Sequence, residues 1–202
     1  MTLTTRLTRM LGIPHPILLA AMDIVSDARL TLAVSRAGGF GILGGGYGER
    51  AWLERQLPEL SAAGLPFGVG FITWSLARKP DLLALALESK PAAIWLSFGD
   101  PAPFADQVKA AGCKLICQVQ TVEMARDAVA KGADIVVAQG AEAGGHGASR
   151  GTFALVPAVA DAVGDKAVVV AAGGFADGRG LAAALMLGAE GVVLGTRLYA
   201  SQ

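Results

Sequence analysis

The chain has 202 residues, of which 53% are hydrophobic, so we expect one domain with a large core over residues 1–202. Lysine plus arginine and aspartate plus glutamate both total 17, and this formal net charge of zero argues against a nucleic-acid-binding or anionic-membrane surface. The mean hydropathy of +0.50 is high, yet Gly or a charged residue ends each apolar run well before the ~20 residues of a membrane span.

Eight short apolar runs predict β-strands. They span residues 17–22, 40–43, 67–72, 93–98, 115–119, 135–138, 167–171 and 192–196. Before many of these runs, small residues that end a helix are followed by glycine, as at Gly38, Gly64, Gly112, Gly132 and Gly188. Glycine in this place stops a helix in the left-handed conformation and turns the chain into the next strand.

Helical patterns separate most of these strands. Residues 27–37 carry apolar side chains on one face, and Ser26 is the expected N-cap. Thr121 is expected to cap residues 122–131 in the same way.

Two further helical segments carry specific expectations. Residues 181–187 are apolar all round, which predicts a buried helix. The helix over residues 49–63 contains Pro58, which predicts a break or kink there.

The alternation of strands and helices indicates an α/β protein with a parallel sheet. Eight such units favour a closed (β/α)8 TIM barrel over an open doubly wound sheet. The chain ends at Gln202, directly after the eighth run. We therefore expect a barrel that is open on one side because it lacks the eighth outer helix, or a fragment of a longer chain.

The two cysteines, Cys113 and Cys117, lie next to or inside one predicted strand. No second cluster of Cys or His completes a metal site, so no metal is expected. We interpret them as buried free thiols of a protein in a reducing cytoplasm. The first ten residues lack an apolar segment and predict no signal peptide.

Active sites of such barrels lie at the carboxyl ends of the strands. The residues in this position are Ala21, Met22, Asp23, Gly70, Gln118, Gln139, Gly144, Gly145, His146, Gly173, Gly174, Gly195 and Thr196.

Four of these candidates follow the seventh and eighth strands, where this fold usually binds phosphate. At Gly173, Gly174 and Gly195, backbone N–H groups can approach a phosphate closely, and Thr196 can donate its hydroxyl. The alternative is a set of ordinary turns in a glycine-rich chain.

The two histidines differ in their expected roles. His146 stands in a glycine-rich loop that can aim its imidazole at the barrel mouth as a general acid or base, although a solvent-exposed loop residue is the alternative. His15 precedes the first strand, at the end of the barrel associated with stability, and is expected to be structural.

Other polar residues near the strand ends leave alternatives open. The carboxamides of Gln118 and Gln139 can match the edge of a heterocycle such as a flavin pyrimidine, or can pack inside the barrel. Arg197 could pair with a phosphate or with Glu142, and the sequence does not choose between them. Glu142 itself could be a base, but a solvated loop acid is the simpler interpretation.

Several segments resemble the nitronate monooxygenases, formerly called 2-nitropropane dioxygenases. Residues 139–146 resemble their signature loop, residues 171–179 their phosphate loop and residues 195–197 the end of their last strand. Residues 16–22 and 37–41 also fit, so the resemblance covers essentially the whole chain.

The resemblance implies FMN as cofactor, with its phosphate at strands seven and eight. It assigns the isoalloxazine to the backbone of Ala21, Met22 and Asp23 and to the side chains of Gln118 and Gln139, its edge to Gly144 and Gly145, and catalysis to His146. The implied reaction is the oxidation of alkyl nitronates or nitroalkanes with O2.

Three departures from the family stand out. Gly70 occupies a position that is commonly Asn, so one flavin hydrogen bond is expected to be missing. Gln118 and Gln139 stand where many relatives carry Lys and Asp, which removes a cation near the flavin. Family members also continue past the eighth strand.

Two other functions remain open. One is reduction of an enoyl thioester or a quinone by NAD(P)H on the same FMN barrel. The other is a truncated, non-catalytic remnant. An uncovered strand edge would favour self-association into a homo-oligomer.

Overall fold

The computed structural model describes residues 3–147 and 149–201. Gln202, the last residue, therefore lies outside the described residues. So do Met1 and Thr2, the first two of the ten residues for which no signal peptide is predicted.

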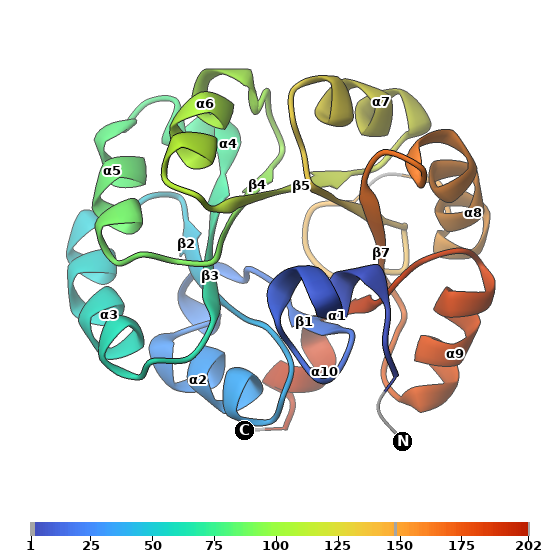
Figure 1. The fold of residues 1–202 in the computed structure, drawn as a ribbon, viewed down its shortest axis with the longest axis horizontal. Helices are drawn as coiled ribbons and strands as arrows, with labels where there is room; N and C mark the ends of the chain where they lie inside the picture. Colours follow the sequence, from blue (N-terminus) through green and yellow to red (C-terminus); the bar gives the residue numbers. More distant parts are fainter. Residues whose placement is uncertain (1–2, 148, 202) are drawn as a thin grey trace.

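The described residues form a barrel of eight parallel strands surrounded by helices (Figure 1), which confirms the (β/α)8 TIM-barrel prediction. The strands are β1 (Ile17–Leu19), β2 (Gly41–Gly46), β3 (Phe67–Ile72), β4 (Ala93–Ser97), β5 (Lys114–Val119), β6 (Ile135–Gln139), β7 (Val168–Ala172) and β8 (Val192–Leu194). The helices are α1 (Arg6–Leu11), the 3-10 helix η1 (Asp23–Val25), α2 (Ala28–Arg36), α3 (Arg50–Ala62), α4 (Thr73–Leu76), α5 (Asp81–Glu88), α6 (Ala102–Ala110), α7 (Val122–Ala130), α8 (Thr152–Val163), α9 (Gly178–Met186) and α10 (Thr196–Tyr199).

The ring of strands closes at β1. Neighbouring strands pair in the order β1-β8-β7-β6-β5-β4-β3-β2, and a single parallel bridge between Leu18 and Phe40 joins β1 to the residue before β2. The expected opening in the sheet is therefore absent from the described part of the chain, although the seam at β1 is short. Side chains at alternate positions fill the barrel interior, including Trp95, Ile116 and Val137.

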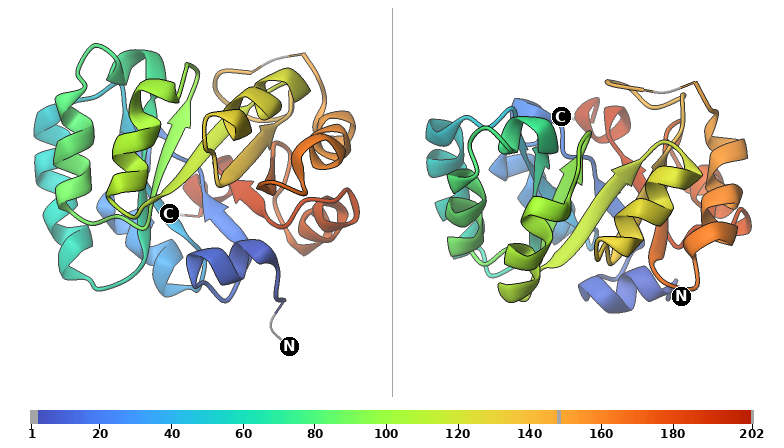
Figure 2. Two further views of the ribbon diagram at one scale, coloured as in Figure 1. Left: turned by 45° about the horizontal axis from the view of Figure 1, so that its top comes forward. Right: turned by 90° about the horizontal axis from the view of Figure 1, so that it is seen from above.

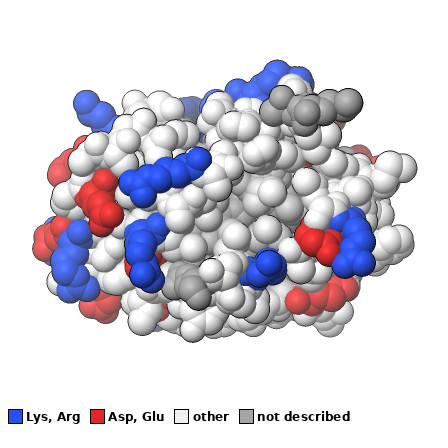
Figure 3. Space-filling view, turned by 90° about the horizontal axis from the view of Figure 1, so that it is seen from below, with Lys and Arg blue, Asp and Glu red and all other residues white. Residues whose placement is uncertain are grey.

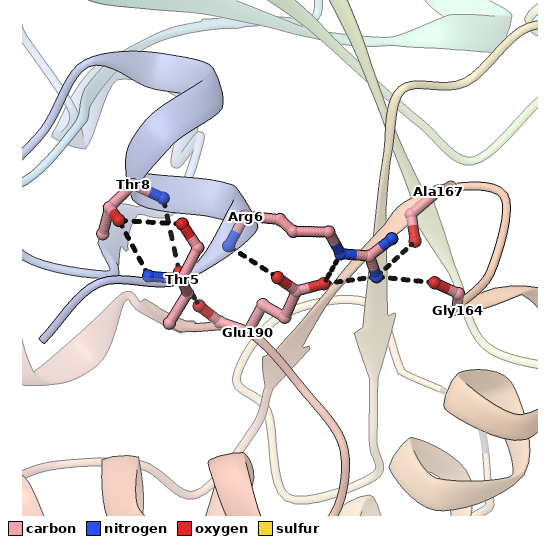
Figure 4. Close-up of polar contacts among 6 residues, drawn as sticks. All are labelled: Thr5, Arg6, Thr8, Gly164, Ala167 and Glu190. Carbon is pink, nitrogen blue, oxygen red and sulfur yellow. Dashed lines mark hydrogen bonds and ion pairs between the residues drawn. The ribbon is translucent and has the colours of Figure 1, made fainter.

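The amino-terminal helix α1 closes the lower end of the barrel in the right-hand panel of Figure 2. Leu7 and Leu11 pack against the interior side chains, and Thr5 caps the helix by accepting a hydrogen bond from the Thr8 amide. Arg6 links α1 to the loops that precede β7 and β8. Its guanidinium pairs with Glu190 and donates to the carbonyls of Gly164 and Ala167 (Figure 4). The sequence reading did not identify this helix.

The side of the barrel between α2 and α9 has no long outer helix among the described residues. After β8 the chain forms only the four-residue helix α10. Figure 3 looks onto this side, where uncharged atoms make up most of the central surface. Among the described residues, only the short helix α10 thus follows β8, while the sheet itself still closes.

Several local predictions are confirmed. Thr121 caps α7 by accepting from the Met124 amide. The five glycines that were expected to end helices before the strands all have positive φ, from 63° at Gly64 to 95° at Gly132.

Helix α3 is continuous through Pro58, so the expected break is absent and a kink there stays a prediction. Two local predictions are wrong. Asp27, not Ser26, caps α2, because the Ser26 hydroxyl donates instead to the carbonyl of Ala20. Helix α9 is not buried, because it lies on the outside of the barrel beside the uncovered face; Met186 is 87% exposed.

None of the helices in the described ranges is long and apolar enough to cross a membrane.

Candidate active site

A cavity of about 830 Å³ lies at the carboxyl ends of the strands. All candidate residues from the sequence line it, although they come from six different strand ends: Ala21, Met22, Asp23, Gly70, Gln118, Gln139, Gly144, Gly145, His146, Gly173, Gly174, Gly195 and Thr196. The fold therefore brings them together, whereas His15 lies outside the cavity lining. Their individual roles remain predictions.

The segment after β1 enters the cavity because glycines on β2 leave room for it. A side chain at Gly44 would meet the backbone oxygen of Asp23 at 2.0 Å, and one at Gly46 would meet the Asp23 carboxylate. Gly70 is constrained in the same way, since a Cβ there would lie 2.3 Å from the Cβ of Ala21. This crowding gives a physical reason why Asn cannot simply replace Gly70 in this chain.

The ends of β7 and β8 expose backbone donors to the cavity. The amides of Gly173, Gly174, Gly195 and Thr196 donate to no acceptor among the described residues. Gly173 has a φ of 111°, and a Cβ there would meet the Thr152 hydroxyl at 2.7 Å. Only glycine therefore allows the chain to turn here with its N–H groups free, and such groups suit an anion.

The loop after β6 is held by Glu142. Its carboxylate accepts hydrogen bonds from the amide and the hydroxyl of Thr152, both at 2.7 Å, at the start of α8. These bonds hold the pKa of Glu142 below its usual value, first through the Thr152 hydroxyl and then through its amide. Glu142 is therefore a weak base with a structural task, and it forms no ion pair with Arg197 in the described ranges.

His146 lies on the same loop, at the cavity rim. Its ring lies 5.3 Å from the ring of Phe98, measured between centroids, and its backbone carbonyl accepts from the side chain of Gln120 at 3.3 Å. Two neighbouring strand ends thus contact the residue, although the side chain itself is exposed.

Gln118 and Gln139 contact each other inside the barrel. The Nε2 of Gln118 donates to the Oε1 of Gln139 at 2.6 Å, and Gln120 donates to the same oxygen at 2.9 Å. Gln139 is only 7% exposed, yet it still lines the cavity.

The sequence reading missed the aromatic part of the site. Tyr47 and Phe98 line the cavity directly after β2 and β4, two strand ends at which the sequence analysis names no candidate. The rule used for the other strands would have found both residues. Phe98 is also one of two described non-glycine residues with positive φ, at 59°, a conformation that the sequence does not reveal.

Neither a metal site nor a reactive thiol accompanies the cavity. The described residues contain no group of three or more His, Cys, Asp or Glu that could hold a metal ion. Cys113 and Cys117 are free, buried and outside the cavity lining. Burial raises the pKa of both thiols, that of Cys117 to about 12.

Comparison with known proteins gives a consistent family. The sequence model of the family described as nitronate monooxygenase matches residues 4–80 and 77–202. A nitronate monooxygenase of Pseudomonas aeruginosa is 38% identical over 96% of this chain and 68% of its own length. A Mycobacterium tuberculosis protein named (3aS,4S,5R,7aS)-5-hydroxy-7a-methyl-1-oxo-octahydro-1H-indene-4-carboxyl-CoA dehydrogenase is 39% identical over 98% of this chain and 56% of its own.

Among solved structures, FabK from Thermotoga maritima superposes with a TM-score of 0.91 at 40% identity, over 98% of this chain and 63% of that chain. The chain thus spans between 56% and 68% of the length of these relatives. Matching segments at both ends of the chain and a shared barrel establish that it belongs to the nitronate monooxygenase family of oxidoreductases.

Proposed function

We propose that the chain carries the FMN site and the catalytic histidine of an enzyme that oxidises alkyl nitronates or nitroalkanes with O2. The observation that carries the proposal is the convergence of His146, the two glutamines and four free backbone amides on one cavity. The proposal is limited to the residues of this chain, because the related proteins are longer than the chain.

The residues present fit FMN. The free amides of Gly173, Gly174, Gly195 and Thr196 suit a phosphate, and Gln118, Gln139 and the segment after β1 line the same cavity of about 830 Å³. Gln139 is only 7% exposed, and its Nε2 has no partner among the described residues. This nitrogen is therefore available to donate a hydrogen bond to a heterocycle. When bound, FMN would supply the electron transfer and the chemistry with O2.

His146 would handle the proton. The C–H next to a nitro group is acidic, and a neutral imidazole nitrogen at the cavity rim can take that proton from a nitroalkane. With a substrate that is already a nitronate, the same imidazole would hydrogen-bond to a nitronate oxygen. Phe98, against the ring, limits where the imidazole can lie.

A second candidate uses the same cavity for NAD(P)H-dependent reduction of an enoyl thioester or a quinone. The observation that favours it is the 39% identity to a protein named as a carboxyl-CoA dehydrogenase. Rapid bleaching of the bound flavin by NADH without oxygen would favour this reaction, whereas no bleaching by NADH and oxygen uptake with a nitronate would favour the first.

The deciding experiment is an absorbance spectrum of the purified protein, followed by oxygen uptake with ethylnitronate. The proposal expects a flavin spectrum, release of FMN on denaturation and uptake that depends on His146. A colourless protein that fails to bind added FMN would instead indicate a non-catalytic remnant.

Two expectations from the sequence accompany this proposal. The buried free thiols suit a reducing cytoplasm. Exposed apolar side chains such as Phe153, Met186 and Tyr199 favour self-association, which gel filtration with light scattering would test.

A further inference from the structure

Side chains of three neighbouring strands form a chain of hydrogen bonds across the barrel interior. The indole Nε1 of Trp95 donates to the hydroxyl of Ser97 at 2.6 Å, and this hydroxyl donates to the Oε1 of Gln118 at 3.4 Å. The Nε2 of Gln118 then donates to the Oε1 of Gln139. The chain of bonds therefore runs from β4 through β5 to β6.

The pleat of the barrel places these side chains together. Residues two apart on a strand share a face, so Ser97 lies on the interior face with Trp95. By the same alternation Gln118 follows the interior residue Ile116, and Gln139 follows the interior residue Val137.

The two ends of this hydrogen-bond chain fix its direction. An indole N–H can only donate, so the hydroxyl of Ser97 accepts from Trp95 and keeps its proton for Gln118. At the other end, Gln120 donates to the backbone carbonyl of His146, which can only accept. The amide nitrogen of Gln120 therefore faces Gln139 as well, and the facing atom of Gln139 must be its oxygen.

Only one orientation of Gln139 satisfies both sets of bonds. Its Oε1 accepts from Gln118 and Gln120, and its Nε2 is left without a partner among the described residues. Because the residue is 7% exposed and lines the cavity, this nitrogen is the polar group that it offers to a bound molecule.

We infer that Trp95, Ser97 and Gln120 are positioning residues that hold Gln139 as an obligate hydrogen-bond donor to the bound heterocycle. The inference rests on the proposed FMN site for the identity of that heterocycle. The group facing Gln139 must then present an acceptor, a carbonyl oxygen or a ring nitrogen lone pair of the flavin, and not its N–H. Since Gln120 also holds the carbonyl of His146, one side chain links the cofactor contact to the catalytic loop.

The test compares Ser97→Ala with Ser35→Ala. The two serines are both 7% exposed, and each makes two hydrogen bonds, but Ser35 joins the carbonyl of Pro66 to the amide of Gly41 far from the glutamines. FMN binding is measured by quenching of flavin fluorescence. Ser97→Ala is expected to raise the Kd for FMN about tenfold, the effect of one lost hydrogen bond, and Ser35→Ala to change it less than about twofold. Equal effects of the two variants would contradict a positioning role.

A second measurement does not depend on FMN. In the ¹⁵N spectrum of the cofactor-free wild type, an amide proton of Gln118 should exchange with water more slowly than those of Gln139, and Ser97→Ala should remove that protection. The reverse order of protection, or an unchanged spectrum in the variant, would overturn the inference. Failure of the wild type to bind FMN would instead refute the proposed function, while the exchange data would still decide the orientation of Gln139.

Discussion

The ring of Phe98 packs against the imidazole of His146, with 5.3 Å between their centroids. Phe98 adopts a left-handed backbone conformation, with φ at 59°, at the point where β4 ends. The chain thus turns sharply as it leaves the barrel, and the aromatic ring reaches the loop that follows β6. This contact gives an otherwise exposed histidine a defined place at the cavity rim.

Replacing His146 by alanine should lower the turnover of a nitroalkane by about 100-fold or more, because a positioned acid or base contributes at least that factor. The effect should be smaller for the nitronate, which has already lost its proton. Oxygen uptake with nitroethane and with ethylnitronate measures both rates. His15→Ala is the matched control, because this histidine does not line the cavity and should leave both rates unchanged. Equal losses with the two substrates would argue against proton removal by His146.

Replacing Gly173 by alanine should weaken FMN binding at least about tenfold. The φ of 111° is strained for any side chain, and the new Cβ would press on the Thr152 hydroxyl at 2.7 Å. Titration with FMN and with riboflavin, which lacks the phosphate, shows whether the loss falls on the phosphate contact.

Gly112→Ala provides the matched control for that substitution. Gly112 also has a positive φ, 73°, but no atom lies within 4 Å of an added Cβ, and the residue is remote from the cavity. FMN affinity should therefore survive. Equal affinities of the wild type for FMN and riboflavin would show that Gly173 and Gly174 bind no phosphate.

Glu142→Gln should destabilise the protein most above about pH 4.5, the ordinary pKa of glutamate. The bonds from Thr152 lower the pKa of Glu142 in the folded state, so the unfolded state binds its proton more readily. The stabilisation is therefore complete above the unfolded pKa and is lost as the pH falls through the folded pKa. Urea unfolding of both proteins at neutral and acidic pH checks this. A stability difference that grows on acidification would show that the sign is wrong.

The two thiols should be inert in the native state. Burial raises the pKa of Cys113, and raises that of Cys117 to about 12, so almost no thiolate forms near pH 8. Ellman's reagent should label neither cysteine in the folded protein and both in guanidinium chloride. Rapid labelling of one thiol under native conditions would show that it reaches solvent.

Leu7→Ala should lower the free energy of unfolding by about 2–5 kcal/mol, because the side chain is fully buried where α1 closes the barrel. Leu3→Ala, at a side chain that is 44% exposed, should cost no more than about 0.5 kcal/mol. Similar stabilities of the two variants in a urea titration would mean that α1 adds little to the core.

Part of the site was accessible from local pattern alone. Gly173, Gly174, Gly195 and His146 each follow an apolar run, and the rule that TIM-barrel sites lie at the carboxyl ends of the strands placed them at one end of the molecule. The same rule would have found Tyr47 and Phe98. Gln120 also directly follows an apolar run, but its role comes from the two acceptors that β6 and the His146 loop bring to it, and the sequence does not reveal them.

The wrong predictions for the burial of α9 and for the N-cap of α2 have the same physical cause, because both outcomes depend on contacts with other segments of the chain. The apolar residues 181–187 predict a buried helix, but burial depends on what covers a helix. Helix α9 borders the side of the barrel that has no long outer helix among the described residues (Figure 1). Ser26 and Asp27 are both good N-cap residues. Asp27 caps α2 because the hydroxyl of Ser26 donates its hydrogen bond to the carbonyl of Ala20.

The sequence by itself determined the alternation of strands and helices, the parallel (β/α)8 barrel and most of the residues at its mouth, because hydrophobic period and glycine position are local properties of the chain. Only the tertiary structure decided which of these residues touch, that Glu142 is engaged by Thr152 rather than free to act as a base, and that Gln139 turns its nitrogen to the cavity. Hydrogen-bond direction is settled by partners from distant segments, and those partners meet only after the barrel has closed.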